Sequence, residues 1–151
     1  MMGRVRYPTL YPERRANACA YKRWVAKRWQ TRARNHYDQL QRLLANPYML
    51  ARVIVYSIFP RSTAAAALSV VGCETGETYD ESAHNSSTDV RGYFQVDSGN
   101  HGRVFHWNNQ TLVLNSDRLY DPWYNTKVAV FMTKGGVYWN EWHCQPFVGT
   151  G

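Results

Sequence analysis

Apolar and aromatic side chains recur with helical spacing along the first third of the chain. In residues 13–46 they fall about every 3.6 residues: Tyr21, Trp24, Val25, Trp29, Tyr37, Leu40 and Leu44. The pattern predicts one long helix over this range. We expect the helix to end at Asn46-Pro47, because proline disfavours the helical conformation of the residue before it.

Two further elements follow in the next thirty residues. Residues 48–59 form a short apolar run that fits either a buried helix or a strand. An Ala-rich run then predicts a helix that begins at Ser62, a suitable N-cap, and is terminated at Gly76.

Residues 77–117 lack helical periodicity and are rich in Gly, Asn, Ser and Asp, with short strand candidates such as "GYFQV" at 92–96. The Asp-Pro pair at 121–122 then starts a last helix, which the Gly-Gly pair at 135–136 ends. We therefore expect a mainly α fold of the α+β kind, with a small irregular or β segment. Such a segment, held by a rigid scaffold, is where binding residues are often found.

Charge divides the chain into two parts. Residues 1–62 carry 13 Lys and Arg against two acidic residues, a net +11, and residues 63–151 carry five against nine, a net −4, which sum to +7. The basic N-terminal helix fits either a solvated helix face or attraction to polyanions such as wall teichoic acids, anionic lipid head groups or nucleic acid. No nucleic-acid-binding motif is present, so specific recognition of nucleic acid is not expected.

Composition favours one soluble domain. With 151 residues, 44% of them hydrophobic, the chain can bury a substantial core. No apolar segment follows the basic N-terminal residues as in a signal peptide, and the longest apolar run, residues 53–59, is far shorter than the ~20 residues that span a bilayer. If the protein acts outside the cytoplasm, we expect something other than its own leader to deliver it.

Three cysteines are present, Cys19, Cys73 and Cys144. Their number fits one disulfide with a spare thiol, or three reduced thiols. No two have the spacing of metal ligands and no His cluster stands near them, so neither a metal nor another cofactor is expected.

The segment "VVGCETGETYD" places Glu74 at the end of the Ala-rich helix. Ala67, Val70 and Val71 share its face of the helix, so a buried face would make Glu74 project from an apolar wall. Partial desolvation and the negative end of the helix dipole both raise a carboxyl pKa, which suits a general acid. The alternative is an exposed Glu74 in a frayed last turn.

Four segments in order, "CETG", "RGYFQVDSGNH", "LYDPWYNTKVAVFM" and "YWNEWHC", resemble the lysozyme-like superfamily of peptidoglycan-cleaving enzymes. "CETG" with the late "WHC" is similar to the resuscitation-promoting-factor domain, and "GYFQVDSGNH" is similar to the Gly-Leu-Met-Gln-Val-Asp-x-x-x-His segment of goose-type lysozymes. The resemblance covers roughly residues 60–145. It implies a lysozyme-like catalytic domain at 60–151. Residues 1–59 lie outside the resemblance, and from their charge and periodicity we expect a basic helical extension.

The resemblance assigns roles to four polar residues. Glu74 matches the catalytic acid, and Gln95 matches the glutamine that shapes the sugar cleft, although it also fits a strand glutamine bound to backbone. Asp97 matches an aspartate that helps to place a water molecule, and His101 matches a cleft-lining donor. Asp80 and Asp89 stay as other candidates for a second carboxylate.

The resemblance also implies a disulfide between Cys73 and Cys144, with two reduced cysteines as the alternative. Tyr93 and Tyr124 are expected to stack on sugar faces. Asn125, within "DPWYN", is expected to fix local structure.

These expectations together describe a monomeric muramidase or lytic transglycosylase that acts on peptidoglycan at the cell wall, of phage or bacterial origin, either extracellular or carried on a virion. The basic helix would contact an anionic wall polymer or a membrane surface. Two other readings stay open, a non-catalytic protein that binds wall glycan and a basic protein that binds nucleic acid.

Overall fold

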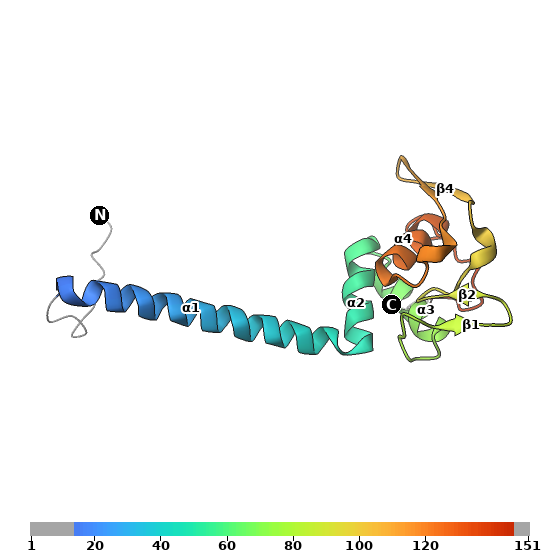
Figure 1. Cartoon of the computed structure of the whole chain (residues 1–151). Helices are drawn as coiled ribbons and strands as arrows, with labels where there is room; N and C mark the ends of the chain where they lie inside the picture. Colours follow the sequence, from blue (N-terminus) through green and yellow to red (C-terminus); the bar gives the residue numbers. More distant parts are fainter. Residues whose placement is uncertain (1–13, 147–151) are drawn as a thin grey trace. The chain divides into compact units, whose positions relative to one another are not determined.

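The computed structural model describes residues 14–146 and the side chains from residue 18 onward. The chain divides into two compact units, Met1–Arg42 and Leu43–Gly151 (Figure 1). The boundary therefore falls earlier than the one expected after residue 59. The reason is that the apolar run after the first helix packs into the second unit.

Helix α1, Arg14–Leu44, confirms the long N-terminal helix. Its described side chains are mostly exposed, including Trp24 and Trp29. The guanidinium groups of Arg28 and Arg32 lie 5.3 and 5.4 Å from the ring centres of these two tryptophans. Each cation thus covers part of an exposed apolar face, as long basic side chains commonly do.

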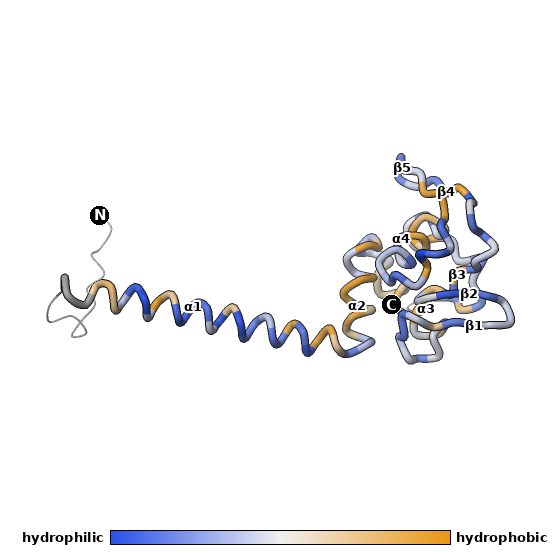
Figure 2. Tube along the Cα trace, in the orientation of Figure 1, coloured by the Kyte–Doolittle hydropathy of each residue, from blue (hydrophilic) through white to orange (hydrophobic). Residues whose placement is uncertain are grey.

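Helix α2, Pro47–Ile58, settles the ambiguous apolar run as a helix. Asn46 caps it by accepting a hydrogen bond from the Met49 amide at 3.2 Å, and Pro47 occupies the first turn, where its missing N–H costs nothing. Its buried residues Ala51, Ile54 and Val55 recur at i, i+3 and i+4. In Figure 2 apolar residues of α2 are orange.

Helix α3, Ala64–Glu74, begins one residue later than expected. Its N-cap is Thr63 rather than Ser62, and the Thr63 hydroxyl donates to the Gly135 carbonyl at 2.7 Å instead of capping the helix. The expected end is confirmed, because Gly76 adopts the left-handed conformation (φ +62°) that commonly terminates a helix.

Helix α4, Pro122–Met132, starts at the predicted Asp-Pro pair. The Asp121 carboxylate accepts hydrogen bonds from the Trp123 and Tyr124 amides. Helices α3 and α4 both pack against α2 (Figure 1). Most residues of α3 and α4 are buried, so these two short helices form the centre of the second unit.

The remaining elements are short. Strands β1 (His84–Asn85), β2 (Val90–Arg91) and β3 (Val96–Asp97) form an antiparallel sheet in that order, and β4 (Val104–Trp107) pairs with β5 (Gln110–Val113) as a hairpin. Two 3-10 turns, η1 (Ser98–Asn100) and η2 (Ser116–Arg118), complete the set. The expected strand at 92–96 is mostly a turn, with only its last residue in β3. The mainly α fold with a small β segment is confirmed.

An aromatic cluster closes the core of the second unit. Phe94 lies 5.6 Å from Phe59 and 6.2 Å from Trp139, and Trp139 lies 5.3 Å from Trp142, measured between ring centres. The Trp142 indole also donates to the Phe94 carbonyl at 2.7 Å. These contacts attach the late segment of the chain to the turn before β3. Among the described residues, no helix has the length and apolarity needed to cross a membrane.

Candidate functional site

Glu74 is the last residue of α3 and its side chain is partly buried. The residues that precede it on the same face, Ala67, Val70 and Val71, are fully buried. The helix therefore presents its final carboxyl from an apolar wall, as the sequence predicts. The alternative of an exposed Glu74 in a frayed turn is wrong.

The surroundings of Glu74 act on its ionisation in both directions. Burial raises the pKa of the carboxyl above its ordinary value of 4.5. A hydrogen bond from the Cys144 amide to Oε1, at 3.1 Å, and the Coulombic interaction with His143 lower the pKa, but burial is the larger effect. Glu74 consequently holds its proton to a higher pH than an exposed glutamate.

The expected disulfide between Cys73 and Cys144 is confirmed. It joins residues 71 apart in sequence whose Cα atoms lie 5.9 Å apart. The bridge and the hydrogen bond from Cys144 attach one late segment to two consecutive residues of α3. Cys19 is an exposed free thiol.

Glu74 lines an open cleft of about 650 Å³. The loop after α3 and strand β1 form most of its wall, and Gln95 lies on it as well. The structure thus brings together the two residues that the resemblance assigns to the acid and to the cleft wall. Most of the other lining side chains carry a hydroxyl, an amide, an imidazole or a carboxylate: Thr75, Thr78, Asp80, Ser82, His84, Asn85 and Ser86, with Ala83 between them.

Gln95 lines the cleft and binds backbone, as the alternative expected, although it lies in a turn and not in a strand. Its side-chain amide donates to the Ala83 carbonyl at 2.9 Å and to the Gly92 carbonyl at 2.8 Å. Gln95 itself has φ +46°, which turns the chain sharply before β3. One side chain therefore holds the turn at 92–95 against the loop that forms the cleft wall.

Asn125 fixes the same turn from inside the core, as expected. Its side-chain oxygen accepts from the Phe94 amide at 2.9 Å, and its nitrogen donates to the Arg91 and Leu119 carbonyls at 2.8 and 2.9 Å. Gly92 permits this approach, because an added Cβ would lie 2.4 Å from the Asn125 nitrogen, and its φ of +77° also favours glycine.

Among the candidates for a second carboxylate, Asp80 shares the cleft with Glu74. Its Oδ1 accepts hydrogen bonds from the Ser82 hydroxyl at 2.7 Å and the Ser82 amide at 2.9 Å. These bonds lower the pKa of Asp80, so the group is ionised at neutral pH. The cleft therefore holds one carboxyl with a raised pKa and one with a lowered pKa.

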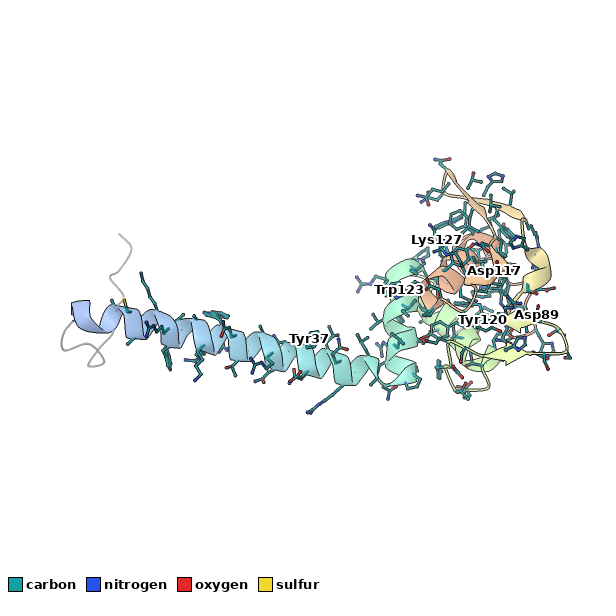
Figure 3. The ribbon with its side chains drawn as sticks, in the orientation of Figure 1. Tyr37, Asp89, Asp117, Tyr120, Trp123 and Lys127 are labelled. Atoms are coloured by element: carbon teal, nitrogen blue, oxygen red, sulfur yellow. A yellow bond between two sulfur atoms is a disulfide. The ribbon has the colours of Figure 1, made fainter. Side chains whose placement is uncertain are left out.

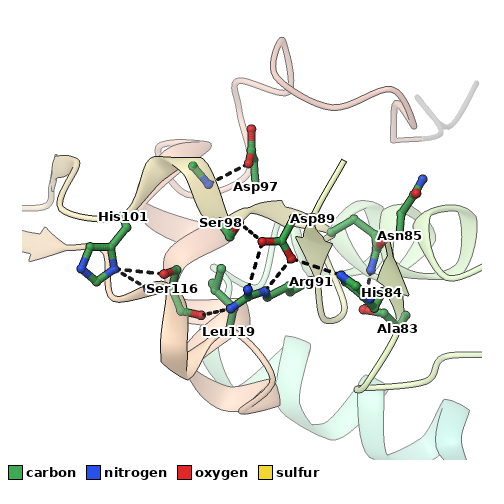
Figure 4. A network of polar contacts seen from close by, with 12 residues as sticks. Ala83, His84, Asn85, Asp89, Arg91, Asp97, Ser98, His101, Ser116 and Leu119 are labelled. Atoms are coloured by element: carbon green, nitrogen blue, oxygen red, sulfur yellow. Dashed lines mark hydrogen bonds and ion pairs between the residues drawn. The ribbon is translucent and has the colours of Figure 1, made fainter. Parts of the chain in front are cut away.

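Asp89 belongs instead to a structural network that joins β1, β2 and η1 (Figure 4). Its carboxylate accepts two bonds from Arg91 at 3.0 Å and one from the Ser98 hydroxyl at 2.5 Å, and it lies 3.1 Å from His84 Nε2. Arg91 and these further donors hold the pKa of Asp89 far below its ordinary value of 3.8. Because its oxygens are occupied, Asp89 is poorly suited to activate water.

Asp97 and His101 lie outside the cleft, contrary to expectation. The Asp97 carboxylate accepts from the Gly99 amide at 2.8 Å and caps η1 (Figure 4). His101 Nδ1 accepts from the Ser116 amide at 3.1 Å. Both side chains hold the irregular segment together and neither lines the wall near Glu74.

Neither tyrosine lines this cleft. The Tyr93 ring is fully buried, and its hydroxyl has no hydrogen-bond partner among the described residues. Burial and the charges of Glu81 and Asp80 raise the Tyr93 pKa, so the phenol stays neutral. Tyr124 is also buried, accepts a bond from the Asn115 amide at 2.8 Å, and borders a different cavity. Contrary to expectation, neither ring is placed to stack on a sugar bound in this cleft.

Sequence reasoning missed the polar residues that line the wall, above all Ser82, His84 and Asn85. The only available signal was the Ser- and Asn-rich composition of the loop, which marks a region but no single residue. Within residues 14–146 there is no group of three or more His, Cys, Asp or Glu side chains that could hold a metal ion. No protein-family model matches the chain, and no curated protein or solved structure is detectably similar to it.

Proposed function

We propose that this protein cleaves the glycan strand of peptidoglycan, as a muramidase or a lytic transglycosylase, with Glu74 as the general acid. The observation that carries the proposal is the half-buried Glu74 carboxyl, whose pKa is raised, on the wall of a polar cleft of about 650 Å³. That volume lies within the range of about 300–1,000 Å³ that is common for ligand sites.

Glycosidic bonds break when a carboxylic acid protonates the oxygen of the leaving group. The acid must be protonated near the working pH, and burial of Glu74 acts in that direction. The hydrogen bond from Cys144 holds Oε1, which leaves the other oxygen of the carboxyl to carry the proton. The disulfide supports this geometry by fixing the residue before Glu74.

Asp80 takes the role of second carboxylate in this proposal, in place of Asp97. It is ionised and lies in the same cleft, so it can stabilise the positive charge that develops on the sugar ring or activate a water molecule. A hydrolase would use Asp80 in this way. A lytic transglycosylase would instead let a hydroxyl of the substrate attack, and Glu74 alone would suffice.

The lining of the cleft supports a sugar as the ligand. Asn85 offers its side-chain nitrogen and Ser86 its hydroxyl, and the Ser82 hydroxyl, which donates to Asp80, can still accept a hydrogen bond from a sugar hydroxyl. Cleft-lining aromatic rings are missing from this set, so polar contacts would provide most of the recognition.

We also propose that α1 brings the protein to an anionic wall polymer or membrane surface. The helix carries nine Lys and Arg against one acidic residue, Asp38. Attraction of this kind weakens steeply with ionic strength. The disulfide fits action in an oxidising compartment, such as the cell wall, the cell exterior or a virion surface.

Two carboxylate-to-amide substitutions test the enzymatic proposal on purified sacculi. Glu74→Gln keeps the shape of the side chain and its acceptor for Cys144 but removes the acid, so release of soluble glycan should fall by at least about 100-fold. Sedimentation with sacculi should be unchanged. Glu81→Gln, in the same loop but outside the cleft lining, is the matched control and should cleave like the wild type.

Three results would count against it. If the wild type binds sacculi without releasing glycan, the protein is a non-catalytic binder. If Glu74→Gln cleaves normally, the acid is another residue. If the protein prefers nucleic acid to sacculi at physiological salt, the basic helix defines its function.

A further inference from the structure

A second cavity, of about 390 Å³, lies on a different part of the second unit from the Glu74 cleft. It shares no lining residue with that cleft. The end of α2, the β4–β5 hairpin, η2 and one side of α4 enclose it. We infer that this cavity binds an anionic sugar, a pyranose that carries a carboxylate or a phosphate, between Trp107, Trp123, Arg118 and Lys127.

Two tryptophans give the cavity its apolar faces. Trp123 is 47% exposed although it sits in the first turn of a helix that is otherwise largely buried. Trp107 packs edge-on against Phe131, with 5.9 Å between ring centres. Indole faces of this kind match the apolar face of a pyranose ring, and an exposed one adjoining a cavity is available to a ligand.

Trp107 is held in place before any ligand binds. Gly135 has φ +80°, and a Cβ added there would lie 3.0–3.2 Å from the Trp107 indole, so the ring rests directly on the glycine backbone. The Lys134 ammonium group donates to the His106 carbonyl and ties the hairpin to the same region. A ring fixed in this way loses little freedom when a ligand binds.

The charged groups of the cavity favour an anion. Lys127 follows Trp123 by one turn of α4, so both side chains lie on one side of the helix (Figure 3). Arg118 lies over the Tyr124 ring at 4.2 Å, which orients its guanidinium. In the described part of the chain, neither cation forms an ion pair.

Among the described residues, Asp121 is the one acidic residue on the cavity wall. Its carboxylate is committed to the first turn of α4 through the Trp123 and Tyr124 amides. The lining therefore keeps a net charge of +1 with two unpaired cations. Gln110 adds an amide that can bind a sugar hydroxyl. A neutral sugar would use the rings and Gln110, whereas an acidic sugar would use the two cations as well.

Nuclear magnetic resonance titration of the full chain tests the inference through the indole N–H signals of Trp107 and Trp123. The four probes are glucose, glucuronic acid, glucose 6-phosphate and inorganic phosphate. We expect at least one acidic sugar to bind about tenfold more tightly than glucose, which corresponds to one charge-assisted contact. Comparison of the two acidic sugars distinguishes a carboxylate from a phosphate. Inorganic phosphate, which lacks the ring, should bind more weakly than glucose 6-phosphate.

Two variants assign the binding to this cavity. Trp123→Ala should weaken the acidic sugar about tenfold, and Lys127→Gln should weaken it about fivefold without changing glucose. Both residues are exposed, so folding should survive. Tyr138→Ala and Arg61→Gln remove an exposed ring and an exposed cation of the second unit outside the cavity lining, and they should leave the sugar affinities unchanged.

The inference is overturned if neither acidic sugar binds more tightly than glucose, or if inorganic phosphate binds as tightly as glucose 6-phosphate. It is also overturned if Trp123→Ala and Lys127→Gln bind like the wild type. Loss of binding in Glu74→Gln would assign the sugar to the other cleft. The test does not depend on cleavage of peptidoglycan, so the two proposals fail separately.

Discussion

The amide of Cys144 donates a hydrogen bond to the Glu74 carboxyl group, and the sulfur of Cys144 is bonded to that of Cys73, the residue before Glu74. Cys144, from the late segment of the chain, therefore both fixes the end of α3 and lowers the pKa of its last side chain, Glu74. The hydrogen bond lowers the pKa of Glu74 but does not cancel the effect of burial. The late segment is thus a structural part of the site.

Removing the disulfide should destabilise the second unit and impair cleavage together. Closing a loop of 71 residues contributes about 4 kcal/mol in the chain-entropy treatment. We expect the double substitution Cys73→Ser and Cys144→Ser to lose a free energy of unfolding of this order, measured by urea denaturation. Cys19→Ser, which removes the free thiol, is the control. A double variant as stable as the wild type would show that the bridge does not hold the site.

Replacing Glu74 by glutamine should stabilise the protein increasingly as the pH rises. The folded protein raises the pKa of Glu74 above its ordinary value of 4.5, so ionisation is harder in the folded than in the unfolded state. Stability linked to the proton is therefore complete below that value and is lost as the pH rises through the raised pKa. Glutamine has no such loss.

Melting temperatures at pH 4 and pH 8 provide the measurement. The difference between Glu74→Gln and the wild type should be larger and more positive at pH 8. Glu81→Gln controls for the change in net charge. An equal difference at both pH values would contradict the assigned ionisation of Glu74.

Substitution of Asn125 should disrupt the turn that carries Gln95. Asn125→Ala removes three hydrogen bonds and leaves the Phe94 amide and the Arg91 and Leu119 carbonyls without a partner. We expect a loss of about 3 kcal/mol or more in the free energy of unfolding. Asn125→Asp should also lower the free energy of unfolding, because a carboxylate oxygen would face the Arg91 and Leu119 carbonyl oxygens in place of the amide nitrogen that donates to them.

The control for this change is Asn140→Ala, an exposed asparagine in the same unit. Its effect should stay within about 0.5 kcal/mol. If Asn125→Ala were equally mild, the turn at 92–95 would have to be held by Gln95 and the core packing alone.

Neutralising Asp89 should loosen the small sheet at neutral pH. Asn accepts the left-handed backbone of this position, φ +51°, so Asp89→Asn changes the charge with little change in shape. The folded state lowers the pKa of Asp89 below 3.8, so its contribution is present above that pH and is lost as the pH falls further.

The melting temperature of Asp89→Asn should accordingly lie below that of the wild type at pH 7, and the gap should narrow at pH 2. Asp117→Asn, at an exposed position in η2, makes the same change elsewhere. A gap that stays constant with pH would assign the effect to shape rather than charge.

Sequence reasoning succeeded where one side chain has one structural requirement. The apolar face of α3 predicts a buried wall beneath Glu74, and the start of α4 at the Asp121-Pro122 pair follows from local chemistry. The pairing of Cys73 with Cys144 came from resemblance, because spacing alone leaves the partners open. The position of Gln95 near Glu74 came from the same source.

Prediction from sequence failed where tertiary contacts decide the place of a side chain and the local sequence does not. Tyr93 follows a glycine in a polar loop, yet the Gly92 turn directs its ring into the core. Asp80, Asp89 and Asp97 carry the same side chain, and only the resemblance favoured Asp97. Tertiary contacts distinguish them. Arg91 and Ser98 donate hydrogen bonds to the Asp89 carboxylate, and the Gly99 amide in η1 donates to Asp97, whereas Asp80 lines the cleft.

The central claim is that Glu74 protonates a glycosidic bond of peptidoglycan. Mass spectrometry of the soluble products from sacculi, with wild type and Glu74→Gln in parallel, tests it most directly. We predict glycan fragments from the wild type alone. Reducing ends would indicate hydrolysis with Asp80 as partner, and 1,6-anhydro ends would indicate a transglycosylase. Identical products from both proteins, or no fragments from the wild type at any pH between 4 and 8, would contradict the claim.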